Sequence, residues 1–206
     1  FRPAARWSRC RPAVPYFVYL DVVFHTFFQN TLREHEFDRF DLERIWSDES
    51  SFLERAAGVF FESQWGLDTA RSAYGLHGSH YFAVGRGGGL EPPEADIYRP
   101  GTLKLLSIAN DFHQKGGDIV FEAYKALRTR FPELSWHIVG GRPPRAVSSA
   151  AGVFHEGMLS PDVPRELDRL RSLLSSAFLL VHPAREDTSP LVLTESAYFG
   201  CPAVSV

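Results

Sequence analysis

Residues 181–206 read VHPAREDTSPLVLTESAYFGCPAVSV, and this stretch decides how the rest of the chain is interpreted. The apolar run that leads into it, 178–181, is typical of a parallel strand that is buried on both faces. A loop follows, and Pro190 favours a helix start because proline fits the first turn of a helix. Gly200 closes this helix, and 202–206 reads as the next strand. The stretch therefore predicts one strand, helix and strand unit of a parallel α/β sheet.

Two acids lie close to the predicted helix start. Asp187 stands in the loop before the helix, and Glu195, eight positions later, lies about two turns inside it. Both can reach the crevice outside the carboxyl ends of the strands, where open α/β sheets bind ligands. The amides of Leu191 and Val192 and the dipole of the helix that starts at Pro190 favour an anion there. The pattern suits a phosphate with a hydroxylated ring on each side.

The segment 185–202, REDTSPLVLTESAYFGCP, resembles a family signature: the acid-x7-Glu pattern and Gly-x-Pro turn of retaining nucleotide-sugar glycosyltransferases, the glycosyl transferases group 1, which have the GT-B fold. The resemblance implies that Asp187 holds hydroxyls of the donor sugar, that the helix-start amides hold the diphosphate and that Glu195 holds the ribose. Glu186 is an alternative for the first acid, although its spacing to Glu195 is one position too long. A solvated acidic loop before an ordinary helix is the structural alternative.

A second motif, 112–118 (FHQKGGD), lies between a predicted strand and a predicted helix. Lys115 can place a positive charge beside a diphosphate, and Gly116 and Gly117 let the backbone approach it. The motif resembles the family's Arg-x(n)-Lys-Gly loop, in which the arginine and the lysine neutralise the leaving nucleoside diphosphate. Asn110 stands where the arginine is expected. The alternative is a solvent-facing lysine before a glycine-rich helix start.

Two further loops resemble those that hold the nucleobase in this family through backbone groups. Gly140 and Gly141, followed by Arg142, come after one predicted strand, and Gly157 with Met158 comes after the next. Backbone contacts do not encode the identity of a base in side chains. Uridine, guanosine and adenosine diphosphate sugars therefore all remain open as donors.

Two candidate catalytic residues lie near the start of the chain. Asp21 ends a predicted buried strand over 14–20, and His25 follows four residues later. The resemblance places this region late in the acceptor domain, where such an acid or histidine faces the donor sugar. The alternative for His25 is a packed side chain among phenylalanines.

The rest of the chain alternates strands and helices, which predicts an α/β fold with a doubly wound parallel sheet and right-handed crossovers. By resemblance the fold is GT-B, with two Rossmann-like lobes, the N-terminal lobe partial and the C-terminal lobe truncated. The predicted strands are 14–20, 58–63, 81–84, 103–109, 136–139, 153–154, 178–181 and 202–206, and the predicted helices are 41–57, a segment after Ser63, 118–130, 164–176 and 190–199.

The stretch 85–101 is rich in Gly and Pro and lacks the spacing of a phosphate-binding loop, so it predicts an interdomain connection. We predict a partial N-terminal acceptor-side domain over 1–95 and a nucleotide-sugar donor-binding domain over 96–206. The chain starts at Phe1 and ends inside a predicted strand. From this we expect that a preceding segment and the end of the second domain are missing.

The composition argues against several classes of partner. The net charge of -3 and the absence of a long charged block argue against nucleic acid. No apolar run approaches the ~20 residues of a membrane span and no signal-peptide core is present, so we expect a cytoplasmic protein for which peripheral membrane contact stays open. We interpret one basic cluster as a solvated arm; it consists of Arg2, Arg6, Arg9 and Arg11. For Cys10 and Cys201 we predict neither a disulfide nor a metal site.

The sequence therefore predicts a hexosyltransferase that uses a nucleoside-diphosphate sugar, retains the anomeric configuration and needs neither a metal nor a cofactor. Lys115 and the amides of Leu191 and Val192 would stabilise the departing diphosphate. The acceptor, a glycan, a lipid or a small molecule, is left open. The alternatives are a non-catalytic nucleotide-sugar-binding remnant and a nucleotide-sugar epimerase or a phosphorylase of the same fold.

Overall fold

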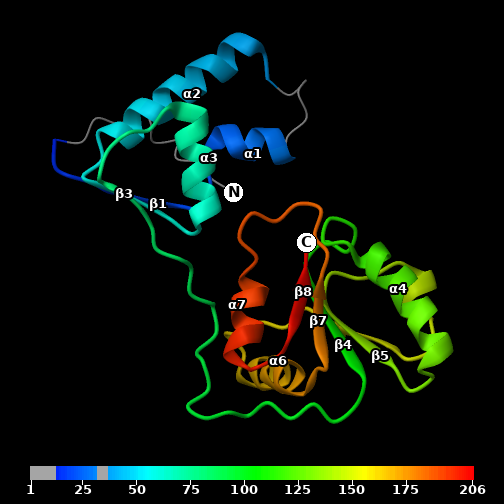
Figure 1. The fold of residues 1–206 in the computed structure, drawn as a ribbon. Helices are drawn as coiled ribbons and strands as arrows, with labels where there is room; N and C mark the ends of the chain where they lie inside the picture. The colour runs from blue at the N-terminus through cyan, green and yellow to red at the C-terminus, as the bar shows by residue number, and fades with distance from the viewer. Residues whose placement is uncertain (1–12, 32–36) are drawn as a thin grey trace. The chain divides into compact units, whose positions relative to one another are not determined.

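A computed structural model describes residues 13–31 and 37–206, and Figure 1 shows how their helices and strands follow one another. The basic cluster and Cys10 lie outside the described residues. The chain divides into two compact units, Phe1–Arg86 and Gly87–Val206. The division falls inside the Gly- and Pro-rich connection, earlier than the boundary at Asp96 that the sequence suggested.

The first unit contains a three-stranded parallel sheet in the order β1-β2-β3. Its core is apolar. Three of its side chains, Leu53, Val59 and Phe61, are fully buried and pack the helices against the sheet. The elements are β1 (Phe17–Leu20), α1 (Phe24–Thr31), α2 (Arg39–Glu54), β2 (Gly58–Phe61), α3 (Gln64–Tyr74) and β3 (Tyr81–Ala83).

Helix α1 was not predicted from the sequence, which gave only a cluster of phenylalanines around His25. Its start is stabilised from a distant part of the chain, because the amide of Phe24 donates a 2.7 Å hydrogen bond to the fully buried carboxylate of Glu49 in α2. Glu49 also accepts a 2.5 Å hydrogen bond from the hydroxyl of Tyr74. A cap that comes from 25 positions away leaves no local signal.

The second unit contains a five-stranded parallel sheet in the order β6-β5-β4-β7-β8. The chain therefore builds outward from β4 in one direction and then returns to continue from β4 in the other, as in a Rossmann fold. The elements are β4 (Lys104–Ala109), α4 (Gly117–Arg130), β5 (Ser135–Gly140), α5 (Arg145–Ser148), β6 (Val153–Gly157), α6 (Pro164–Ser176), β7 (Leu179–His182), α7 (Leu191–Tyr198) and β8 (Ala203–Ser205).

Helices cover both faces of this second sheet. On one face Leu106 and Leu180 pack against α6 and the end of α7, and on the other Leu105 and Trp136 pack against α4. Trp136 is completely buried, and its indole N–H donates a 3.0 Å hydrogen bond to the hydroxyl of Ser107 in β4. The doubly wound parallel arrangement that the sequence predicted is confirmed.

Helix α7 starts one residue later than Pro190, which is extended at ψ 103° and serves as the N-cap. Glu195 consequently lies about one turn inside the helix, and the prediction of two turns was wrong. Among residues 13–31 and 37–206, no helix is long and apolar enough to cross a bilayer.

Candidate functional site

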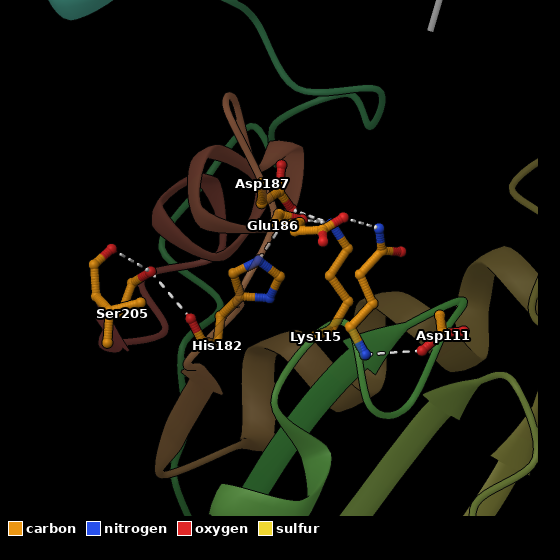
Figure 2. Close-up of polar contacts among 8 residues, drawn as sticks. Asp111, Lys115, His182, Glu186, Asp187 and Ser205 are labelled. Carbon is orange, nitrogen blue, oxygen red and sulfur yellow. Dashed lines mark hydrogen bonds and ion pairs between the residues drawn. The ribbon is translucent and has the colours of Figure 1, made fainter. Parts of the chain in front are cut away.

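The candidate site lies where the strand order of the second sheet reverses, between β4 and β7. Parallel strands end at the same edge, so the loop after β4 meets the loop after β7 there. Their backbones are joined by a 2.9 Å hydrogen bond from the amide of Arg185 to the carbonyl of Gln114. The two motifs that the sequence singled out therefore form one structure, which Figure 2 shows in close-up.

Two glycines allow the loops to approach each other. Gly116 has φ 73°, a left-handed conformation, and a Cβ at this position would overlap the carbonyl oxygen of Pro183. A Cβ at Gly117, the first residue of α4, would overlap the ring of Phe112. Gly116 and Gly117 are thus required by packing, in addition to the role that the sequence predicted for them.

Lys115 and Asp187, which the sequence proposed separately, are in direct contact. The Lys115 Nζ lies 2.9 Å from Asp187 Oδ2 and also donates a 2.7 Å hydrogen bond to the carbonyl of Glu186. His182, the last residue of β7, contacts the same Asp187 oxygen through its Nε2 at 3.0 Å. Figure 2 shows Lys115 and His182 converging on Asp187 from different sides.

The environment of Asp187 keeps its carboxyl group ionised. Burial on its own would raise the pKa, but the hydrogen bonds from His182 and Lys115 and their charges outweigh it and lower the pKa to about 2. The His182 side chain is 4% exposed and the Asp187 side chain 20%. A fixed negative charge therefore remains at this site at neutral pH.

Glu186, the alternative first acid, has a different environment. Its carboxylate accepts a 2.8 Å hydrogen bond from the side-chain amide of Gln114, and only its main-chain carbonyl meets Lys115. Arg185 turns outward and forms a two-pronged ion pair with Asp118, at 2.7 and 2.8 Å. The geometry thus favours Asp187 over Glu186 as the acid that works with Lys115.

The start and the body of α7 carry the remaining donor-site candidates. The N-cap residue, Pro190, makes no side-chain cap hydrogen bond. Further along, Glu195 Oε1 accepts a 2.9 Å hydrogen bond from the amide of Gly89, and the hydroxyl of Tyr198 accepts one of 3.0 Å from Gly88. The glycine-rich connection therefore runs across this face of α7 and orients the acid that the resemblance assigns to the ribose.

A pocket of about 360 Å³ opens at the ends of β4 and β5, beside the loop that carries Lys115. Asn110, Gly141 and Arg142 line it together with Asp111 and His113. The backbone here is tight, because a Cβ at Gly141 would overlap the carbonyl oxygen of Asn110. Such a pocket is where a ligand held by Lys115 could extend.

The last loop with donor-site candidates follows β6. Gly157 has φ 76° with open space around it, and the side chain of Met158 is 64% exposed. Gly140, at the end of β5, has φ 114°, and a Cβ there would overlap the carbonyl oxygen of Ala109. Close packing therefore requires glycine at Gly140, which is buried, whereas Gly157 needs glycine for its left-handed backbone alone.

The remaining candidates, Asp21 and His25, belong to the first unit. Asp21 follows β1, and its Oδ1 accepts a 2.8 Å hydrogen bond from the amide of Val22. The ring centroids of His25 and Trp46 lie 4.7 Å apart, and burial lowers the pKa of His25. His25 also lines a pocket of about 500 Å³ with Trp65.

Sequence reasoning missed several partners of these residues. His182 was not among the candidates, although it directly follows the predicted strand 178–181 and the carboxyl end of a buried parallel strand is where ligand-binding side chains collect. The ion pair of Arg185 with Asp118 joins residues 67 positions apart and left no local signal.

The structure also shows the surroundings of possible metal ligands and of Cys201. Within the part of the chain that the structure describes, no group of three or more His, Cys, Asp or Glu side chains could hold a metal ion. Cys201 is buried, and burial raises the pKa of its thiol.

Comparison with known proteins identifies the second unit. The model of the family "Glycosyl transferases group 1" matches residues 102–206, about half of the chain. The chain belongs to this family. No curated protein sequence matches it significantly.

Solved structures show the same fold as this group 1 chain. WaaG, a glycosyltransferase involved in lipopolysaccharide biosynthesis, has a TM-score of 0.63 and 18% identity over 94% of this chain. TarM of S. aureus, solved with fondaparinux, alpha-GlcNAc-glycerol and UDP, has a TM-score of 0.61 and 12% identity over 85% of the chain. HepE of Anabaena, solved with UDP and glucose, has a TM-score of 0.56 and 16% identity over 93% of it.

These likenesses establish the GT-B fold for this member of the family. The chain spans 60% of the length of WaaG, 34% of TarM and 52% of HepE.

Proposed function

We propose that this chain binds a nucleoside-diphosphate sugar in its second unit and takes part in retaining transfer of a hexose to an acceptor. The observation that carries the proposal is the meeting of Lys115, Asp187 and His182 at the point where the strand order reverses. Membership of group 1 and the UDP bound in two structures of the same fold support it.

The geometry leaves bonding capacity for such a donor. A lysine ammonium has three N–H groups, and two of those on Lys115 are used by Asp187 and the carbonyl of Glu186, so one remains for a phosphate oxygen. Asp187 uses Oδ2 for both Lys115 and His182. Among the described residues no donor pairs with its Oδ1, which can accept a hydroxyl of the sugar.

Each residue then has one task in the proposed reaction. Lys115 and the start of α7 stabilise the negative charge that develops on the departing diphosphate. Asp187 orients the sugar, and its fixed charge lies near the carbon where positive charge develops. Glu195, held by the amide of Gly89, receives the ribose. Asp21 and His25 remain candidates for contact with the sugar, and no metal enters this scheme.

A second function, nucleotide-sugar binding without transfer, is favoured by one observation. Asn110 stands where the family resemblance places the second cation for the diphosphate, and an amide carries no charge to neutralise the leaving group. Nucleotide binding without turnover, with each acceptor class supplied, would select this function over transfer.

Calorimetric titration with uridine, guanosine and adenosine diphosphates tests the donor site. We expect one of them to bind, and Lys115→Ala to weaken its binding by roughly tenfold to a hundredfold, the usual worth of a hydrogen bond to a charged group. Glu195→Ala should weaken it by a similar factor. Lys125→Ala is the matched control, because Lys125 lies on the exposed surface of α4 beside Glu122. Failure of all three diphosphates to bind the folded chain would refute the proposal.

A further inference from the structure

The missing arginine leaves the proposed diphosphate site with one cation, Lys115, in the loop after β4. A diphosphate carries more charge than one ammonium can neutralise, so the second unit is expected to offer another cation near by. Asn110, at the position of the missing arginine, lines the pocket at the ends of β4 and β5.

The sheet register brings the loop after β5 to the same place. Ala109 pairs with Gly140, and the amide of Gly141 donates a 2.9 Å hydrogen bond to the carbonyl of Ala109. The two loops are packed so closely that only glycine fits at Gly141. Arg142 is the next residue, and it lines the pocket together with Asn110.

The charges around this pocket single out Arg142. Lys115 is paired with Asp187, and Arg185 is paired with Asp118. The Arg142 side chain is exposed and, within residues 13–31 and 37–206, has no acidic partner within ion-pair distance.

Two further ionisable groups line the pocket. Asp111 is its carboxylate, and Oδ1 of that group accepts a 2.7 Å hydrogen bond from the amide of Gln114. His113 lies 3.9 Å from Asp118. Arg142 is therefore the cation of the pocket that can turn to a new anion without breaking an ion pair.

We propose that the guanidinium of Arg142 binds the diphosphate of the nucleotide from the loop after β5, and so replaces the arginine in whose place Asn110 stands. This inference rests on the proposed function. A guanidinium can bind two phosphate oxygens at once, and Arg142 lines the same pocket as Asn110, so it can reach the same ligand from the neighbouring strand. In this arrangement the second cation comes from the loop after β5 instead of the loop after β4, and it lines the same pocket.

The first test compares two arginines by calorimetric titration with the three nucleoside diphosphates. Arg142→Ala should weaken binding of the preferred diphosphate by roughly tenfold to a hundredfold, and the loss should be smaller for the corresponding monophosphate. Arg145→Ala removes the same charge three residues away, outside the pocket lining, and should change binding by less than about twofold. Equal losses in both variants, or equal losses for both nucleotides, would overturn the assignment.

The second test restores the cation at its other position. In the Arg142→Ala background, Asn110→Arg should recover most of the lost affinity, because both side chains line one pocket. Lack of recovery in a folded double variant would contradict replacement. If Lys115→Ala weakens binding and Arg142→Ala does not, the inference fails and the donor site stands. If no diphosphate binds, both fail.

Discussion

Asp187 is the residue on which the site depends, and its ionisation gives a prediction about acid. Its pKa of about 2 in the folded chain is below the ordinary value of 3.8, so the folded chain binds fewer protons there than the unfolded chain. The stabilisation is therefore complete above about pH 4 and is lost as the pH falls toward 2. Asp187→Asn should lower stability near neutral pH, and the difference from the parent chain should shrink over that window.

Urea unfolding of the two chains at several pH values measures this difference. Asp162→Asn is the control, because the Asp162 carboxylate forms no ion pair among the described residues, and it should leave stability unchanged within about 0.5 kcal/mol. A difference between parent and Asp187→Asn that stayed constant from pH 7 to pH 3 would contradict the assigned environment.

His182 illustrates what the sequence could and could not predict about single residues. Lys115 and Asp187 were recognised because each stands in a local motif with a spacing that has a chemical reason. The contact of His182 with Asp187 spans only five positions, yet it depends on where the loop folds back after β7. The roles of Asp21 and His25 stay predictions, since the first unit shows where they lie and not what they bind.

Gly116, in the loop that leads into α4, gives a prediction about the stability of the second unit. Gly116→Ala adds the cost of a left-handed conformation, about 1–2 kcal/mol, to an overlap with the carbonyl of Pro183. We expect the stability of the second unit to fall by more than about 2 kcal/mol in urea unfolding. Gly157→Ala is the matched control, because its φ of 76° carries the same conformational cost with nothing within 4 Å. Equal losses in the two variants would show that the two loops do not pack as described.

Helices and strands whose apolar residues recur at regular spacing were predicted well, because that spacing marks the side chains that each element buries. Helix α6 was predicted with the bounds that it has, and β4, β5 and β7 were each found within a residue or two. Helix α5, four residues long, was missed because one turn shows no period. The early start assigned to α7 came from Pro190, but this residue serves as the N-cap and remains outside the helix.

The two units have separate hydrophobic cores, so we expect a cavity made in the core of one unit to destabilise that unit. Leu53→Ala removes a fully buried side chain of the first unit and should cost that unit about 2–5 kcal/mol, measured by denaturation. Nucleoside-diphosphate binding in the second unit should change by less than about twofold in calorimetry. Leu173→Ala, in the core of the second unit, is the matched variant and should weaken both stability and binding. Loss of nucleotide affinity in Leu53→Ala would contradict a nucleotide site confined to the second unit.

The strand order of the second sheet has a consequence for how the chain becomes functional. Strands β4, β5 and β6 follow one another closely, whereas β4 meets β7 only late: the hydrogen bond from Ser107 to the carbonyl of Val181 joins residues 74 positions apart. Contacts of such long range slow folding, because a large loop must close before they form. During synthesis the half-sheet with the Asn110 and Arg142 pocket emerges first, and Lys115 meets Asp187 only after β7 has left the ribosome. A chain interrupted before β7 would therefore carry the pocket without the acid that completes it.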